Sequence, residues 1–188
     1  ENSTGGCNTF VGVNSGCANG TGRFNTFIGY SAGHYNTDCK NTFIGFSSGC
    51  DNTTGCDNTF IGFSSGLSND DGFENTFMGS FAGYSNTSGD CNTFMGHESG
   101  FSNTTGSLNT YVGARAGRQG NGVQNAYFGR DAGLVATGNN NTFIGYSSPN
   151  PRYEFFRSFT LNSELLHLQL EAAAKESLPK SDRNAQRS

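Results

Sequence analysis

The five residues Asn25-Thr26-Phe27-Ile28-Gly29 decide the fold, because near copies of them return along most of the chain. The copies begin at asparagines spaced 16 or 17 residues apart: Asn8, Asn25, Asn41, Asn58, Asn75, Asn92, Asn109, Asn125 and Asn141. A repeat this short and regular is typical of a chain that winds once per unit, each unit contacting only its neighbours. We therefore predict an all-β fold, a parallel β-solenoid (β-roll) of about nine coils of 16–17 residues, over residues 1–148.

Each unit contains a short strand with two adjacent apolar positions. Counting the asparagine as position 0, position 2 is always aromatic and position 3 is always apolar. Neighbouring strand residues face opposite ways, so the pattern predicts a strand covered on both faces. The expected core and interface ladder is Phe10, Phe27, Phe43, Phe60, Phe77, Phe94, Tyr111, Tyr127 and Phe143, with Ile28, Ile44 and Ile61 at position 3.

A lone two-layer coil covers only one face of such a strand, so the other face needs a partner. Self-association into a closed oligomer is the simplest answer, because every subunit then makes the same contact. The alternative is a three-sided coil in which one aromatic face is partly exposed or covered by the C-terminal tail.

The second half of each unit is built for close approach and turning. Position 7 is only Ser or Ala, and position 8 is Gly except for Pro149 in the last copy. Position 11 is mostly Asn, followed by polar turn residues, and Asn caps turns with its own side chain. We expect each coil to run as strand, tight turn, short strand and polar turn.

The repeat ends at Pro149-Asn150-Pro151, and residues 149–188 differ in character. Leu161, Leu165 and Leu168 have the spacing of a short helix, which predicts a helical cap or tail with a frayed end.

Composition excludes several classes of protein. The net charge is −4, whereas nucleic-acid binding calls for a basic patch. The sequence contains no run of about 18 apolar residues, so no membrane span is expected. Hydrophobic content of 33% with 28 glycines would fit disorder, but the aromatic residues recur at fixed positions, which favours a narrow core.

The Asn-Thr-Phe-Ile-Gly motif, with its Ser/Ala-Gly and Asn-Thr-Thr-Gly turns, resembles the repeats of bacteriophage tail-fibre and bacterial surface proteins. It is similar, more distantly, to the head repeats of trimeric autotransporter adhesins, which are left-handed parallel β-rolls with three chains side by side. The resemblance covers about residues 2–148. It implies a trimeric, extracellular rod, on a cell surface, secreted filament or virion, that presents a surface to a host glycan or protein.

The six cysteines predict an oxidising compartment. Cys39 and Cys56 lie 17 residues apart, each two residues before a repeat asparagine, so they are expected to stack on adjacent coils. The step between coils, about 4.8 Å, falls within the Cα range of a disulfide. Cys50 could compete for the same partner.

Four asparagines of position 11 also begin Asn-x-Ser/Thr sequons: Asn19, Asn52, Asn86 and Asn103. They are glycosylation candidates if the source glycosylates. The other interpretation is that these are simply favourable turn sequences.

No catalytic, cofactor or metal site is expected. Paired carboxylates do not recur at one position of the repeat, and the three histidines lack ligand spacing. We therefore interpret the chain as a non-enzymatic structural and adhesive segment of an extracellular fibre. The alternative is an ice-binding solenoid, because Thr occupies position 1 in eight of nine copies. Against it, position 1 shares a strand face with apolar position 3, so its threonines are expected to be covered or to flank the core.

Overall fold

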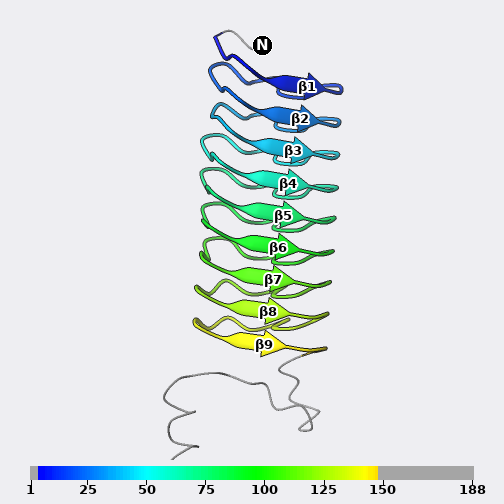
Figure 1. Cartoon of the computed structure of the whole chain (residues 1–188), viewed down its shortest axis with the longest axis vertical. Helices are drawn as coiled ribbons and strands as arrows, with labels where there is room; N and C mark the ends of the chain where they lie inside the picture. The colour runs from blue at the N-terminus through cyan, green and yellow to red at the C-terminus, as the bar shows by residue number, and fades with distance from the viewer. Residues whose placement is uncertain (1–3, 148–188) are drawn as a thin grey trace, which may run out of the picture. The chain divides into compact units, whose positions relative to one another are not determined.

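The computed structural model describes residues 4–147, and in this range every regular element is a strand. Nine parallel strands stack in chain order into one sheet (Figure 1). They are β1 (Thr9–Val11), β2 (Thr26–Ile28), β3 (Thr42–Ile44), β4 (Thr59–Ile61), β5 (Thr76–Met78), β6 (Thr93–Met95), β7 (Thr110–Val112), β8 (Ala126–Phe128) and β9 (Thr142–Ile144). Each pairs in register with the next, so that equivalent repeat positions are neighbours. The predicted parallel β-solenoid is confirmed over about eight turns.

We number each coil by its strand, from the asparagine that precedes it. The strands are short because a β-favouring Thr-aromatic-aliphatic triplet meets a glycine at position 4. Gly45, for example, has φ +139°, and a Cβ there would collide with the carbonyl group of Gly62 in the next coil. The predicted tail, residues 149–188, and the end of the ninth coil lie outside the described residues. In the described part of the chain, no helix is long and apolar enough to span a membrane.

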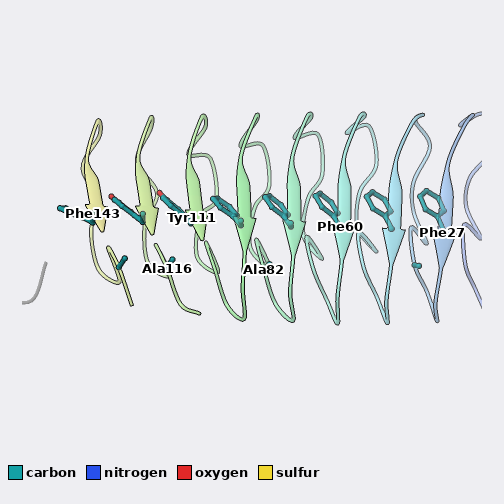
Figure 2. Packing of buried hydrophobic residues seen from close by; sticks show 12 residues of the cluster. Phe27, Phe60, Ala82, Tyr111, Ala116 and Phe143 are labelled. Carbon is teal, nitrogen blue, oxygen red and sulfur yellow. The ribbon is translucent and has the colours of Figure 1, made fainter. Parts of the chain in front are cut away.

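The core is a single column of stacked rings. The position-2 side chains from Phe27 to Tyr127 are completely buried, and Figure 2 shows rings of this column projecting from successive strands. Successive rings are nearly parallel, with centroids 4.6–5.1 Å apart. The spacing matches the step between strands, so the sheet register itself sets the stacking. Position 2 therefore faces the interior of each coil. This is one of the two roles, core or interface, that were expected for the apolar strand positions.

The second half of the coil differs from the prediction, because it contains turns and no second strand. Ser47 at position 6 and Gly49 at position 8 both have left-handed φ, of 50° and 55°, which curls the chain instead of extending it. A Cβ on Gly49 would enter the ring of Phe43. Coils remain connected here by backbone hydrogen bonds, such as that from Gly49 N–H to the carbonyl of Ser65, 3.0 Å.

Two columns of buried asparagines flank the rings. At position 0, the Asn41 N–H donates to Asn25 Oδ1 at 2.8 Å, and Asn41 Nδ2 donates to the Gly55 carbonyl at 2.8 Å. At position 11, Asn52 Nδ2 donates to Asn36 Oδ1 at 2.7 Å and to Gly55, three residues on, at 2.8 Å. Each asparagine thus closes a turn in its own coil and binds the preceding coil. Buried amides need such partners, and the asparagines at position 0 of every coil and at position 11 of coils 1–6 supply them to one another.

Candidate interaction surface

The side chains of positions 1 and 3 point away from the ring column, and we call the surface they form on β1–β9 the outer sheet face. Position 3 gives it an unbroken row of apolar side chains: Val11, Ile28, Ile44, Ile61, Met78, Met95, Val112, Phe128 and Ile144. Those in the middle are partly covered by one another, yet Met95 is still 40% and Phe128 41% exposed. The residues expected to form the core and interface ladder therefore fall into two groups. The position-2 rings are internal, whereas Ile28, Ile44 and Ile61 lie on the outer sheet face.

A second apolar row lies just beyond the ends of β2, β3 and β4, and we call it the rim stack. Tyr30, Phe46 and Phe63, all at position 5, are each about half exposed. Their rings stack from coil to coil, with centroids 5.1 and 5.2 Å apart. Sequence reasoning missed this row, although the signal was present as an aromatic residue at position 5 in three consecutive units. The rim stack widens the apolar surface in coils 2–4.

Coils 6–8 carry charges instead on the same edge. Arg118 Nε lies 2.7 Å from Glu98 Oε2, and its guanidinium covers the ring of Phe101 at 5.0 Å. Arg115 Nη2 donates to Asp131 Oδ2 at 2.8 Å, and this hydrogen bond is the main cause that raises the pKa of Arg115. These charges thus pair with one another within the chain, and along position 6 of coils 6–8 the sign alternates from Glu98 to Arg115 to Asp131.

The described residues do not form a metal centre. Among residues 4–147, no group of three or more His, Cys, Asp or Glu side chains could hold a metal ion. The prediction that the chain has no catalytic function stays a prediction.

Cys39 and Cys56 lie in the segments that lead into β3 and β4, level with each other on adjacent turns. The N–H of Asp57 donates to the carbonyl of Cys39 at 3.4 Å, as the register requires. Both cysteines are thiols here. Cys39 Sγ donates to Asp38 Oδ1 at 3.1 Å, and this bond, with burial, raises the pKa of Cys39. Burial first, and then Asp57, raises the pKa of Cys56.

Cys50 lies elsewhere in the coil, at position 9. Burial, reinforced by the neighbouring Asp51, raises the pKa of Cys50 to about 12. The residues level with it in the flanking coils are His34 and Leu67, so it has no cysteine neighbour at its own position.

Of the two interpretations of Asn19, Asn52, Asn86 and Asn103, glycosylation sites or turn residues, the fold favours the turn. All four side chains are fully buried in the position-11 column. Their Nδ2 atoms, which a glycan would occupy, donate to carbonyl groups within the coil. A glycan there would remove these bonds and enter the packed interior, so the turn interpretation of the sequons applies.

Comparison of the chain with protein-family models, with curated proteins and with solved structures finds no match in any of the three. Its function has to be argued from the geometry of its own coils.

Proposed function

We propose that the chain is a non-enzymatic structural segment of an extracellular fibre, in which copies associate side by side through the outer sheet face. The observation that carries the proposal is the unbroken apolar row of position 3, whose side chains are exposed or half-buried in every coil. Monomeric soluble proteins rarely leave such continuous apolar surface open to water. The row is therefore better explained as a surface that a partner covers.

A second copy of the chain fits this surface better than an unrelated partner. It carries the same rows with the same step between coils, so that two copies brought side by side match coil for coil. Each square ångström of apolar surface removed from water contributes about 25 cal/mol, and the contact repeats along the rod. A cyclic trimer gives each copy the same contact and leaves no chain unsatisfied.

The fibre role follows from what the rest of the coil does. Backbone ladders, asparagine columns and the ring column connect each coil to the next, which suits a part that spaces or carries a load. The polar turns on the other side of the coil remain free to contact a host-surface glycan or protein. An adhesive role would lie on these turns.

Analytical ultracentrifugation of the native chain and two variants tests the proposal. We expect the native chain to sediment as an oligomer, and Ile61→Asp to sediment as a folded monomer, because it places a charge in the apolar row. The matched control is Ser85→Asp, at position 10, where coil 3 already carries Asp51. A native monomer at high concentration, or an Ile61→Asp variant that stays associated, would overturn the proposal.

A second candidate, ice binding, is favoured by one observation. The position-1 threonines were expected to be covered or to flank the core, but they lie on the outer sheet face beside position 3, and those of β2–β7 are half-exposed. They form a regular hydroxyl row at the step of the sheet. Thermal hysteresis of the native chain, lost in Thr76→Tyr and kept in Thr87→Tyr on the polar turn, would support it. Absence of hysteresis in a monomeric preparation would exclude it.

A further inference from the structure

The pair Cys39 and Cys56 is placed for a reaction that neither fibre assembly nor ice binding requires. Thr42 pairs with Thr59, and each cysteine precedes its threonine by three residues. The hydrogen bond from Asp57 N–H to the Cys39 carbonyl shows that this register continues back to the cysteines. Their Cα atoms are therefore one sheet step apart, about 4.8 Å, within the 4.4–6.8 Å that a disulfide spans.

The other cysteines near this pair are held elsewhere. Cys50 stands six residues before Cys56, at a different position of the coil. Cys91 Sγ is within 3.4 Å of a Glu74 carboxylate oxygen and lies two coils beyond Cys56. In the part of the chain that the structure describes, Cys39 and Cys56 are the cysteines that occupy equivalent positions of adjacent coils.

The surroundings of the pair raise the pKa of both thiols. Asp38, Lys40 and Asp57 are the charged groups that act on Cys39, and Asp57 and Asp38 act on Cys56. The carboxylates favour the protonated thiols, so the thiolate that starts an exchange forms seldom at neutral pH. Both side chains are nevertheless half-buried and not enclosed, so a small disulfide can reach them.

We propose that Cys39 and Cys56 form an intrachain disulfide, a redox-controlled cross-link between two turns of the solenoid. The thiolate of one cysteine attacks oxidised glutathione, forming a mixed disulfide and releasing one reduced glutathione. The thiolate of the second cysteine then attacks the protein sulfur, forming the Cys39–Cys56 bond and releasing the second reduced glutathione. The protein loses two protons and two electrons, which reduce one molecule of oxidised glutathione to two of glutathione.

The cross-link closes residues 39–56, one complete turn, into a ring. Unwinding of coil 3 would then require the disulfide to break as well as the ladder. A reducing environment would leave the same turn held only by hydrogen bonds and packing. The inference does not depend on the proposed fibre role, since it concerns a single chain.

Mass spectrometry of the reduced full-length chain after incubation with oxidised glutathione tests the proposal. We expect the part of the native chain that contains Cys39 and Cys56 to lose the mass of two hydrogen atoms, with no stable glutathione adduct on either cysteine, whatever adducts the exposed Cys7 and Cys17 carry. Cleavage after lysine and aspartate separates Cys50 from Cys56 and should yield one peptide pair joined through Cys39 and Cys56. Cys39→Ser and Cys56→Ser should each instead retain one glutathione on the remaining cysteine.

The melting temperature and a control variant distinguish the possible outcomes. The oxidised native chain should melt at a higher temperature than the reduced one, with no such difference in either serine variant. Cys91→Ser, the matched control, should behave like the native chain. Stable glutathione adducts on native Cys39 or Cys56, a bond from either to another cysteine, or a dimer on a non-reducing gel that is linked through either of them would overturn the proposal.

Discussion

The hydroxyl of Tyr111 lies against the backbone of Gly120, so closely that a Cβ on the glycine would stand 3.1 Å from the phenolic oxygen. Gly120 occupies position 11, where the first six coils carry asparagine and their position-2 ring is phenylalanine. In the next coil, Tyr127 likewise replaces the phenylalanine of position 2, and Ala136 replaces the asparagine of position 11. The phenolic hydroxyl and the position-11 amide thus exclude each other within a coil. The position-11 column ends at Asn103, whose Oδ1 is buried without a hydrogen-bond partner.

This exclusion predicts energetic coupling between positions 2 and 11. Gly120→Asn should destabilise the chain because its side chain collides with the Tyr111 hydroxyl. Tyr111→Phe in that background should recover stability by restoring the phenylalanine–asparagine combination of coils 1–6. We expect a coupling of about 1–3 kcal/mol from urea unfolding of the two single variants and the double variant. Additive effects would contradict the mutual exclusion.

The opposite directions of Phe60 and Ile61 predict opposite consequences of truncation. Phe60→Ala opens a gap in the buried ring column and should lower the free energy of unfolding by about 3–5 kcal/mol. Ile61→Ala, one residue on, should change the stability of a monomer far less, because its side chain lies on the outer sheet face. Urea unfolding at low protein concentration compares them. Equal losses would mean that the outer sheet face is not a surface of the monomer.

The asparagine columns predict a large cost for an apparently conservative truncation. Asn52→Ala removes one of two donors to Asn36 Oδ1 and to the Gly55 carbonyl, both of which also accept from Asn41 Nδ2. We expect a loss of about 0.5–1.5 kcal/mol for each of the two lost hydrogen bonds, measured by urea unfolding. Thr54→Ala, an exposed residue of the same turn, serves as the control. A variant at position 52 as stable as that control would refute the structural role of the column.

Alkaline pH should destabilise the fold through its buried acids. Burial raises the pKa of Tyr127 from 10.0 to about 12 and that of Cys50 from 9.0 to about 12. The unfolded chain therefore ionises first, and the stabilisation present below pH 9 declines as the pH rises from about 9 towards 12. The melting temperature should fall over this range, and less steeply in Tyr127→Phe. The difference in tyrosinate absorbance between the native chain and Tyr127→Phe isolates Tyr127; it should rise late, and an early rise of this difference would contradict the burial of Tyr127.

The repeat length predicted the coil, and the aromatic at position 2 predicted the core, because both depend on a period that every unit shares. The prediction of a second strand in each coil was wrong because Ser47 and Gly49 adopt left-handed backbone conformations. Composition alone does not reveal such conformations. The asparagine columns were missed for a different reason. In the sequence, Asn52 fits a turn or a sequon. Its hydrogen bond to Asn36 becomes apparent only when the coils are stacked on one another. The face on which Ile61 lies could likewise be assigned only once the strand was seen packed against the rest of its coil.

The end of the position-11 column at Asn103 has a mechanical consequence. A solenoid pulled along its axis is a series of junctions, each bearing the same tension, so its breaking force is that of the weakest junction and not the sum of them all. The six junctions between coils 1 and 7 differ at their last member, where Asn103 faces Gly120 and the amide hydrogen bond of the position-11 column is missing. The junction between coils 7 and 8 lacks it too, because Gly120 there faces Ala136. A rod stretched from its two ends should therefore part first at a junction beyond coil 6, leaving the six asparagine-laddered coils wound.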